Sequence, residues 1–219
     1  MPRIRELDID LANVDADGLA DGNSSAGSSV TLDGALTSGG TFTSADGLGR
    51  YIAITDAGAD DQSTATYTIT GTDSNDKALT EAITGPTSSG TVISTEAFKT
   101  VTSVAIASPV ASSTVDIGTT AATRVAVSKV YPLNHVSRDA ALVSLDVTGT
   151  INVDIQETFD IIQGDYDHTN AVWFDVASLA SKTADTTSLI TRGATALRVL
   201  INSYSDGAEC QVVINQPRN

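Results

Sequence analysis

Apolar and polar residues alternate regularly between residues 143 and 156, and this alternation constrains the fold more than any other feature. Successive side chains of a β-strand point to opposite faces, so a period of two predicts strands with one buried and one solvated face. No segment keeps the apolar period of about 3.6 residues over three turns that an amphipathic helix requires. The sequence therefore predicts an all-β fold with little helix. The alternating apolar positions are Val143, Leu145, Val147, Ile151, Val153 and Ile155.

Residues 66–86, TYTITGTDSNDKALTEAITGP, show the same pattern with threonine in the polar positions. Tyr67 and Ile69 share one parity and are predicted to face a core, while the threonines around them face solvent. Residues 73–76, DSND, supply short polar side chains that hydrogen-bond their own backbone and favour a turn. Pro86 has no N–H to donate to a β-ladder and should end the second strand. We therefore expect a β-hairpin with one solvated face.

Similar signals predict strands along most of the chain after residue 35. Short apolar runs are separated by Gly, Asp and Ser at intervals of about 8 to 12 residues, a spacing typical of antiparallel β-domains. The last two strands are expected to form a hairpin through residues 205–207, SDG. These last two strands cover residues 196–202 and 210–215. Further strands are expected at residues 51–55, 92–95, 100–107 and 114–117.

The chain of 219 residues is long enough for one large domain or two small ones. The first part of the chain is rich in Gly, Ser and Asp and has few side chains that could pack in a core. We therefore predict an extended N-terminal arm over residues 1–34. Residues 118–139 mark a crossing between two domains. We expect antiparallel β-sandwiches of an Ig-like or jelly-roll-like type at residues 35–122 and 123–219.

The charge of the chain argues against several classes of partner. There are 12 basic and 27 acidic side chains, a formal net charge of −15, and such a chain repels phosphate backbones. We therefore expect no direct binding of nucleic acid. The N-terminus has no apolar signal region, and no apolar run is long enough to span a membrane, so we expect no membrane contact. A single cysteine, Cys210, excludes an internal disulfide framework and indicates folding in a reducing cytoplasm.

Metal-binding motifs are incomplete. Residues 13–18, with Asn13, Asp15 and Asp17, imitate the start of an EF-hand calcium loop, but Ser24 stands where the loop needs a bidentate glutamate. A solvated acidic turn is the prediction. The two histidines, His135 and His168, lack the spacing of zinc ligands. We predict no metal.

Catalytic motifs are missing as well. Neither the phosphate-binding pattern GxxxxGK[ST] nor the dinucleotide pattern GxGxxG occurs. The segment GDYDHTN, residues 164–170, combines Asp165, Asp167 and His168, and an enzyme would have to be built around such a group. The same residue types are common in loops, so residues 164–170 are equally well explained as a loop. We predict no cofactor and no enzymatic activity.

Trp173 and Phe174 form the one concentrated aromatic feature. Neighbouring residues of a strand point to opposite faces, so we expect one ring in a core and the other at a rim or an interface. An exposed Trp173 beside acidic residues would alternatively stack on a sugar ring, and a carbohydrate-binding module stays open as an interpretation.

The motifs occur in an order that resembles a family of virion structural proteins of tailed bacteriophages. TYTITGTDSNDKALTEAITGP is followed by TVISTEAFKTVTSVAIA and STVDIG, as in that family, and VTGTINVDIQETFD, VWFDVASLASKT and ATALRVLINSYSDGAECQVVINQP resemble its C-terminal β-domain. The resemblance covers residues 31–217. It implies a capsid decoration (cement) protein that is made in the bacterial host cytoplasm and stabilises the exterior of the head by bridging capsid subunits.

The resemblance also implies partners. These are the major capsid protein and further copies of this chain, with a homotrimer expected at local three-fold positions. The chain has only ten aromatic residues, and thin cores gain from burying apolar surface between copies. The predicted arm would form a strand on a neighbouring molecule. Its proposed contact residues are Arg3, Ile4, Arg5, Leu7 and Ile9.

A tail or head–tail accessory protein, such as an adaptor or a receptor-binding component, would have the same fold and acidity. The copy number in the virion distinguishes this alternative from a decoration protein.

Overall fold

The computed structural model shows an all-β chain. The described residues contain β-strands and the short 3-10 turn η2 (Ala177–Leu179), and no helix among them is long and apolar enough to cross a membrane. The prediction of an all-β fold is confirmed. The structure describes residues 3–58, 60–111, 113–120, 124–134, 140–161, 170–191 and 193–216.

The chain divides into two compact units. Unit 2 covers Val14–Ala121, and unit 1 combines the two ends of the chain, Met1–Asn13 and Ala122–Asn219. The extended arm expected over residues 1–34 is not separate from these units. Its first part belongs to unit 1, and the remainder contributes strands to unit 2, because the backbone groups of this glycine- and serine-rich segment pair with strands distant in sequence.

Unit 2 consists of two antiparallel sheets. One sheet has the strand order β4-β5-β10-β7-β8, with β3 also paired to β10, and the other has the order β9-β6-β11-β2. The strands are β2 (Ala20–Ser24), β3 (Ser29–Val30), β4 (Thr37–Ser38), β5 (Thr41–Thr43), β6 (Gly49–Asp56), β7 (Thr66–Thr72), β8 (Ala78–Thr84), β9 (Thr91–Phe98), β10 (Thr100–Ala107) and β11 (Thr114–Thr119).

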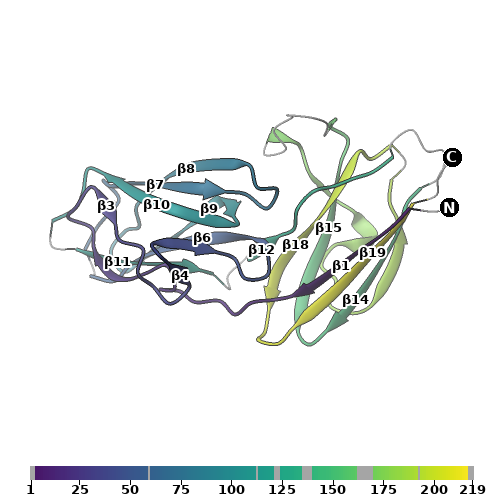
Figure 1. Cartoon of the computed structure of the whole chain (residues 1–219), viewed down its shortest axis with the longest axis horizontal. Helices are drawn as coiled ribbons and strands as arrows, with labels where there is room; N and C mark the ends of the chain where they lie inside the picture. The colour runs from purple at the N-terminus through teal and green to yellow at the C-terminus, as the bar shows by residue number, and fades with distance from the viewer. Residues whose placement is uncertain are drawn as a thin grey trace. The chain divides into compact units, whose positions relative to one another are not determined.

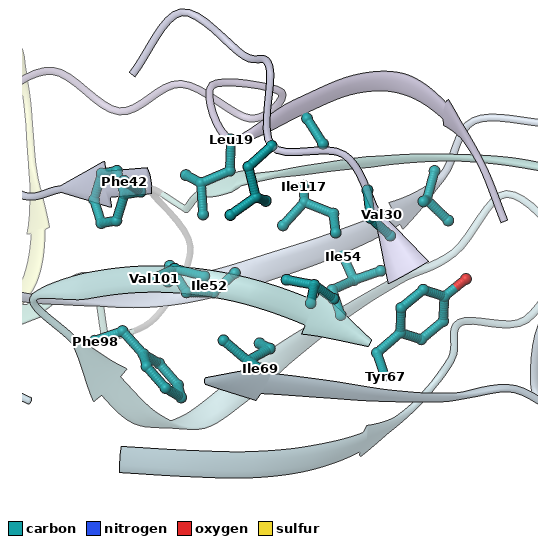
Figure 2. Packing of buried hydrophobic residues seen from close by; sticks show 14 of the residues in the cluster. Leu19, Val30, Phe42, Ile52, Ile54, Tyr67, Ile69, Phe98, Val101 and Ile117 are labelled. Atoms are coloured by element: carbon teal, nitrogen blue, oxygen red, sulfur yellow. The ribbon is translucent and has the colours of Figure 1, made fainter. Parts of the chain in front are cut away.

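Apolar side chains from both sheets form the core of unit 2 (Figure 2). Ile52 and Ile54 of β6 and Ile117 of β11 meet Ile69 and Val101 of the other sheet, and all of them are buried. The alternation of each strand explains this arrangement, since every second side chain points to the same face.

The threonine-rich hairpin lies at an edge of unit 2 as strands β7 and β8. Tyr67 and Ile69 are fully buried and their threonine neighbours are half-buried, so the predicted parity is confirmed. In the turn, Asp73 Oδ1 accepts hydrogen bonds from the N–H groups of Asn75 and Lys77, at 2.7 and 3.0 Å. Thr84 ends β8 before Pro86, as expected.

The outer strand of this hairpin is also tied to β9. The carboxylate of Glu81 accepts hydrogen bonds from the backbone N–H and the hydroxyl of Thr95, both at 2.8 Å, and from the N–H of Glu96 at 3.0 Å. A single polar side chain on β8 thereby joins the edges of the two sheets.

Unit 1 also contains two groups of strands (Figure 1). β1, β19, β14 and β17 form a four-stranded sheet in that order, and β16, β15 and β18 lie side by side with β12 and β13 on the other edge of β18. The strands are β1 (Arg3–Asp10), β12 (Ala126–Val127), β13 (Tyr131–Pro132), β14 (Leu142–Thr148), β15 (Ile151–Thr158), β16 (Phe174–Asp175), β17 (Thr186–Leu189), β18 (Ala196–Tyr204) and β19 (Glu209–Gln216).

The expected final hairpin is wrong in its pairing. Both strands exist, but β18 pairs with β15, whereas β19 pairs with β1 and β14. Residues 205–207 connect the two sheets of unit 1 instead of closing a hairpin. The turn residues predict that the chain reverses direction, but they do not determine which strands pair. Each of the two strands has an apolar face, and each face is buried in a different sheet.

The N-terminal segment is a regular strand. All residues of β1 pair antiparallel with β19, from Arg3 opposite Gln216 to Asp10 opposite Glu209. Leu7 and Ile9 lie opposite Val212 and Cys210, which are buried. The alternation that was expected to dock on a neighbouring molecule is therefore satisfied within the chain.

Gly71 permits the closest approach between β7 and β10. A Cβ atom at this position would lie 1.8 Å from the carbonyl oxygen of Thr100. We expect Gly71→Ala to lower the free energy of unfolding of unit 2 by about 1–3 kcal/mol, the usual cost of overpacking. Amide hydrogen exchange in β7 and β10 measures this change. Gly27→Ala is the control, because its Cβ would meet nothing closer than 3.6 Å; equal effects of both substitutions would contradict the explanation.

Candidate interaction surface

The predicted contact residues of the N-terminal strand divide between two faces. Ile4 points outward and is 61% exposed, whereas Ile9 is buried. Arg5 and Leu7 are half-buried, and Arg3 pairs through its backbone with Gln216. β1 lies at the edge of its sheet, and the structure leaves only Ile4 of the apolar residues in this set open to solvent.

Neither Trp173 nor Phe174 is buried in a core, so the expectation of one core ring is wrong. Trp173 precedes β16, and only Phe174 belongs to the strand. Phe174 is 51% exposed, and its ring lies 6.1 Å from the ring of Phe159 at an angle of 58°. Trp173 is half-buried, and the guanidinium of Arg198 lies over its ring at 4.4 Å. One face of the indole is thus covered by a cation, and a sugar ring would have to displace Arg198 to stack there.

Hydrogen bonds hold Arg198 in place. Its Nε donates to Gln156 Oε1 at 2.7 Å, and Gln156 Nε2 donates to Asp175 Oδ1 at 2.8 Å. These residues come from β18, β15 and β16, which lie side by side. No local sequence pattern indicates these hydrogen bonds, since the bonded residues are 42 and 19 positions apart.

The segment that resembles the start of a calcium loop has a structural contact instead. The backbone carbonyl of Asp15 accepts a hydrogen bond from the N–H of Thr119 at 2.8 Å, and the N–H of Asp15 donates to the Thr119 hydroxyl at 2.9 Å. A hydrogen bond with Asp17 and burial raise the pKa of Asp15. No group of three or more acidic, His or Cys side chains in the described part of the chain is arranged to hold a metal ion.

His135, His168, Asp165 and Asp167 lie outside the described residues. Cys210 is a free, buried thiol on β19, and burial raises its pKa to about 12. Burial likewise raises the pKa of Tyr131 to about 12. Neither group has the lowered pKa of an activated nucleophile.

A buried polar cluster in unit 2 was not predicted. Gln62 Nε2 donates to Asp56 Oδ1 at 3.0 Å and to Ser113 Oγ at 2.8 Å, and the hydroxyl of Tyr67 donates to Gln62 Oε1. The N–H of Ser89 donates to Asp56 Oδ2 at 2.8 Å. The cluster joins β6, β7 and three loops, and its members are as many as 57 residues apart, so no local pattern reveals it.

The exposed apolar side chains are distributed unequally. Among the described residues, seven large hydrophobic side chains are exposed, and all of them belong to unit 1. Unit 2 exposes none in its described part. Exposed apolar side chains that lie together mark interaction surfaces in many soluble proteins. Phe159 and Phe174 are in ring contact, and Ile4, Leu142 and Leu189 share one row of a sheet. The seven residues are Ile4, Leu142, Phe159, Ile161, Val172, Phe174 and Leu189.

Comparison with known proteins found no matching family model and no matching curated protein. The interpretation of this surface therefore depends on the residues of the chain itself.

Asp56 makes the stability of unit 2 dependent on pH. Burial alone would raise its pKa, but hydrogen bonds from the Ser89 N–H, Gln62, the Gly58 N–H and Ser113 outweigh burial and lower it. A lowered pKa stabilises the fold above the unfolded value of about 3.9, and this contribution is lost as the pH falls through the folded value.

We expect the free energy of unfolding of unit 2 to fall less steeply below about pH 4 in Asp56→Asn than in the wild-type protein. Amide hydrogen exchange of β6 and β11 as a function of pH measures this difference. Asp206→Asn, in an exposed turn of unit 1, serves as the control. An unchanged pH slope in Asp56→Asn would show that the hydrogen bonds to Asp56 do not set the acid limit.

Trp173 is the only tryptophan, so its fluorescence reports on the Arg198 contact. We expect Arg198→Ala to red-shift the emission and increase quenching by acrylamide, because the covered ring face becomes accessible. Loss of the cation–π contact should also destabilise unit 1 by about 0.5–2 kcal/mol. Lys182→Ala removes a positive charge elsewhere in the same unit and should leave the spectrum unchanged. Identical quenching in Arg198→Ala and the wild type would disprove the stacking.

Proposed function

We propose that this chain is a non-enzymatic structural protein of a tailed-bacteriophage virion, namely a decoration (cement) protein. It binds the exterior of the capsid after its synthesis in the host cytoplasm and stabilises the head by bridging subunits of the major capsid protein. The proposal needs no metal, cofactor or catalytic residue.

The observation that supports this proposal best is the restriction of exposed apolar side chains to unit 1. A protein that attaches to a preformed shell needs a surface that loses water on docking, and it must stay soluble until then. Unit 1 offers such apolar side chains, and the net charge of −15 opposes self-association before docking.

The sequence adds independent support. The ordered strands ITGTD, TEAITGP and FKTVTS resemble the virion family, and they correspond here to β7, β8, and the end of β9 with the start of β10. In the finer fold that we propose, each unit is an antiparallel β-sandwich of an Ig-like or jelly-roll-like type. A homotrimer at the local three-fold positions of the shell completes the proposal.

Quantitative gel densitometry of purified virions tests the proposed function. We expect the 22.5 kDa chain at a ratio to the major capsid protein of the order set by the shell lattice, because decoration proteins occupy repeated surface sites. A ratio of only a few per cent would place the chain in the tail or at the head–tail junction and would overturn the decoration proposal. Absence from virions would overturn both.

A further inference from the structure

β1, β19 and β14 belong to a four-stranded sheet with β17, and Figure 1 labels the first three. The register makes the outer face of this sheet apolar at one end and acidic at the other. Residues that lie opposite each other on antiparallel strands point to the same face, so the register defines rows across the sheet. The rows through Leu7 and Ile9 point inward. The outer rows contain Ile4, Asn215, Leu142 and Leu189; Glu6, Val213, Ser144 and Thr187; Asp8, Gln211 and Asp146; and Asp10, Glu209 and Thr148.

Three of the four side chains in the first outer row are apolar and exposed, and Asn215 lies between Ile4 and Leu142. We call this row the apolar ridge. Ile4 is 61% exposed, Leu142 38% and Leu189 60%, and they come from three of the four strands. Neighbouring strands lie about 4.8 Å apart, so the row extends about 15 Å across the sheet. Val213 continues the apolar surface in the next row. These side chains are on the face that the core does not use.

The opposite end of the same face is acidic. Asp10 lies directly opposite Glu209, and the next row contains Asp8 and Asp146. Like charges opposite each other destabilise a sheet, and none of the residues in the four outer rows is basic. A hollow of about 320 Å³ opens among these carboxylates, lined by Asp8, Ile9, Asp10, Asp146, Thr148, Glu209, Cys210 and Gln211.

We propose that this outer face binds a protein surface on which lysine or arginine side chains stand beside apolar side chains. The ridge buries the apolar side chains of the partner, and the hollow receives its cations. Gln211 Nε2 donates hydrogen bonds to Glu6 Oε1 and Asp8 Oδ1, both at 2.8 Å, but it carries no charge. Charge complementarity favours a basic partner, because none of the residues in the four outer rows supplies a positive charge. Ile4 thus has the contact role that the sequence suggested, as part of a sheet face instead of an arm.

Other occupants fit less well. A second copy could cover the whole face in two orientations. In one orientation the carboxylates of the two copies would face each other, and in the other the apolar ridge of each copy would face the carboxylates of its partner. A nucleic acid would be repelled. The carboxylates are not arranged as a metal site in the described part of the chain.

The inference rests on the proposed function only for the identity of the partner, which would be the shell protein. The chemistry of the partner follows from the face itself. Two experiments separate these statements, one with a defined peptide and one with shells.

In the first experiment, the ¹⁵N-labelled full chain is titrated with the heptapeptide Leu-Ser-Val-Ser-Lys-Ser-Lys. In an extended conformation its four larger side chains follow the order of the four outer rows. We expect amide shifts on β1, β19 and β14, and their loss at about 0.5 M salt, because screening weakens exposed charge pairs. A matched peptide with Glu in place of Lys should not bind. Shifts elsewhere, or none, overturn the inference.

Variants sharpen this experiment. Leu189→Ser and Asp146→Asn should each weaken peptide binding by about tenfold, since each removes a main contact of the face. Phe174→Ser is the matched control, because Phe174 is also an exposed apolar residue of unit 1 but lies on β16, outside the face. Equal affinity of the Leu189→Ser and Asp146→Asn variants and the wild type would overturn the inference.

The second experiment measures cosedimentation of the chain with virion shells that lack it. Loss of binding in Leu189→Ser and Asp146→Asn, but not in Phe174→Ser, supports the face as the shell contact. If the wild type binds shells and these two variants bind equally well, the face is not the docking surface, although the proposed function stands. If the wild type binds the peptide on this face but does not bind shells, the proposed function fails and the chemistry of the face is supported.

Discussion

The pairing of the two chain ends is the interaction on which the rest of the structure depends. β1 and β19 pair over the full length of β1, although their residues are about 200 positions apart. Unit 1 is therefore discontinuous in sequence, and the whole of unit 2 is inserted between Asn13 and Ala122. A second contact supports this closure, because the hydroxyl of Tyr204 on β18 donates to the carbonyl oxygen of Ala12. Closing so long a loop costs entropy, which the ladder and the buried side chains of β1 offset.

The two units differ in the apolar side chains that they expose. Unit 2 contains a buried hydrogen-bonded cluster of Asp56, Gln62 and Ser113, and its described part exposes no large apolar side chain. Unit 1 is also built from β-strands, but one of its sheet faces presents exposed apolar side chains and acidic rows that contain no basic residue. This difference is the reason why we propose unit 1, and not unit 2, as the binding part of the chain.

Much of the strand content was predictable because alternation is a local property. The strands at Thr66–Thr72, Ala78–Thr84 and Thr100–Ala107 were expected within one or two residues, since buried and solvated faces leave a period of two in the sequence. β2 and β3 were missed because they are short and rich in polar residues, so they leave no such period. The alternation of β1 predicts a strand, but the prediction placed its partner in another molecule, whereas β1 pairs with β19 of the same chain.

The sequence by itself determined the all-β class, the threonine-rich hairpin and the acidic character of the surface, because side-chain chemistry and local periodicity specify them. Only the tertiary structure decided which strands pair, since alternation gives a strand its faces but does not identify its neighbour. The final strand, β19, pairs with β1 and β14 and not with β18. That choice places Ile4, Leu142 and Leu189 in one row and gathers the acidic residues beside them, an arrangement that depends on register across four strands.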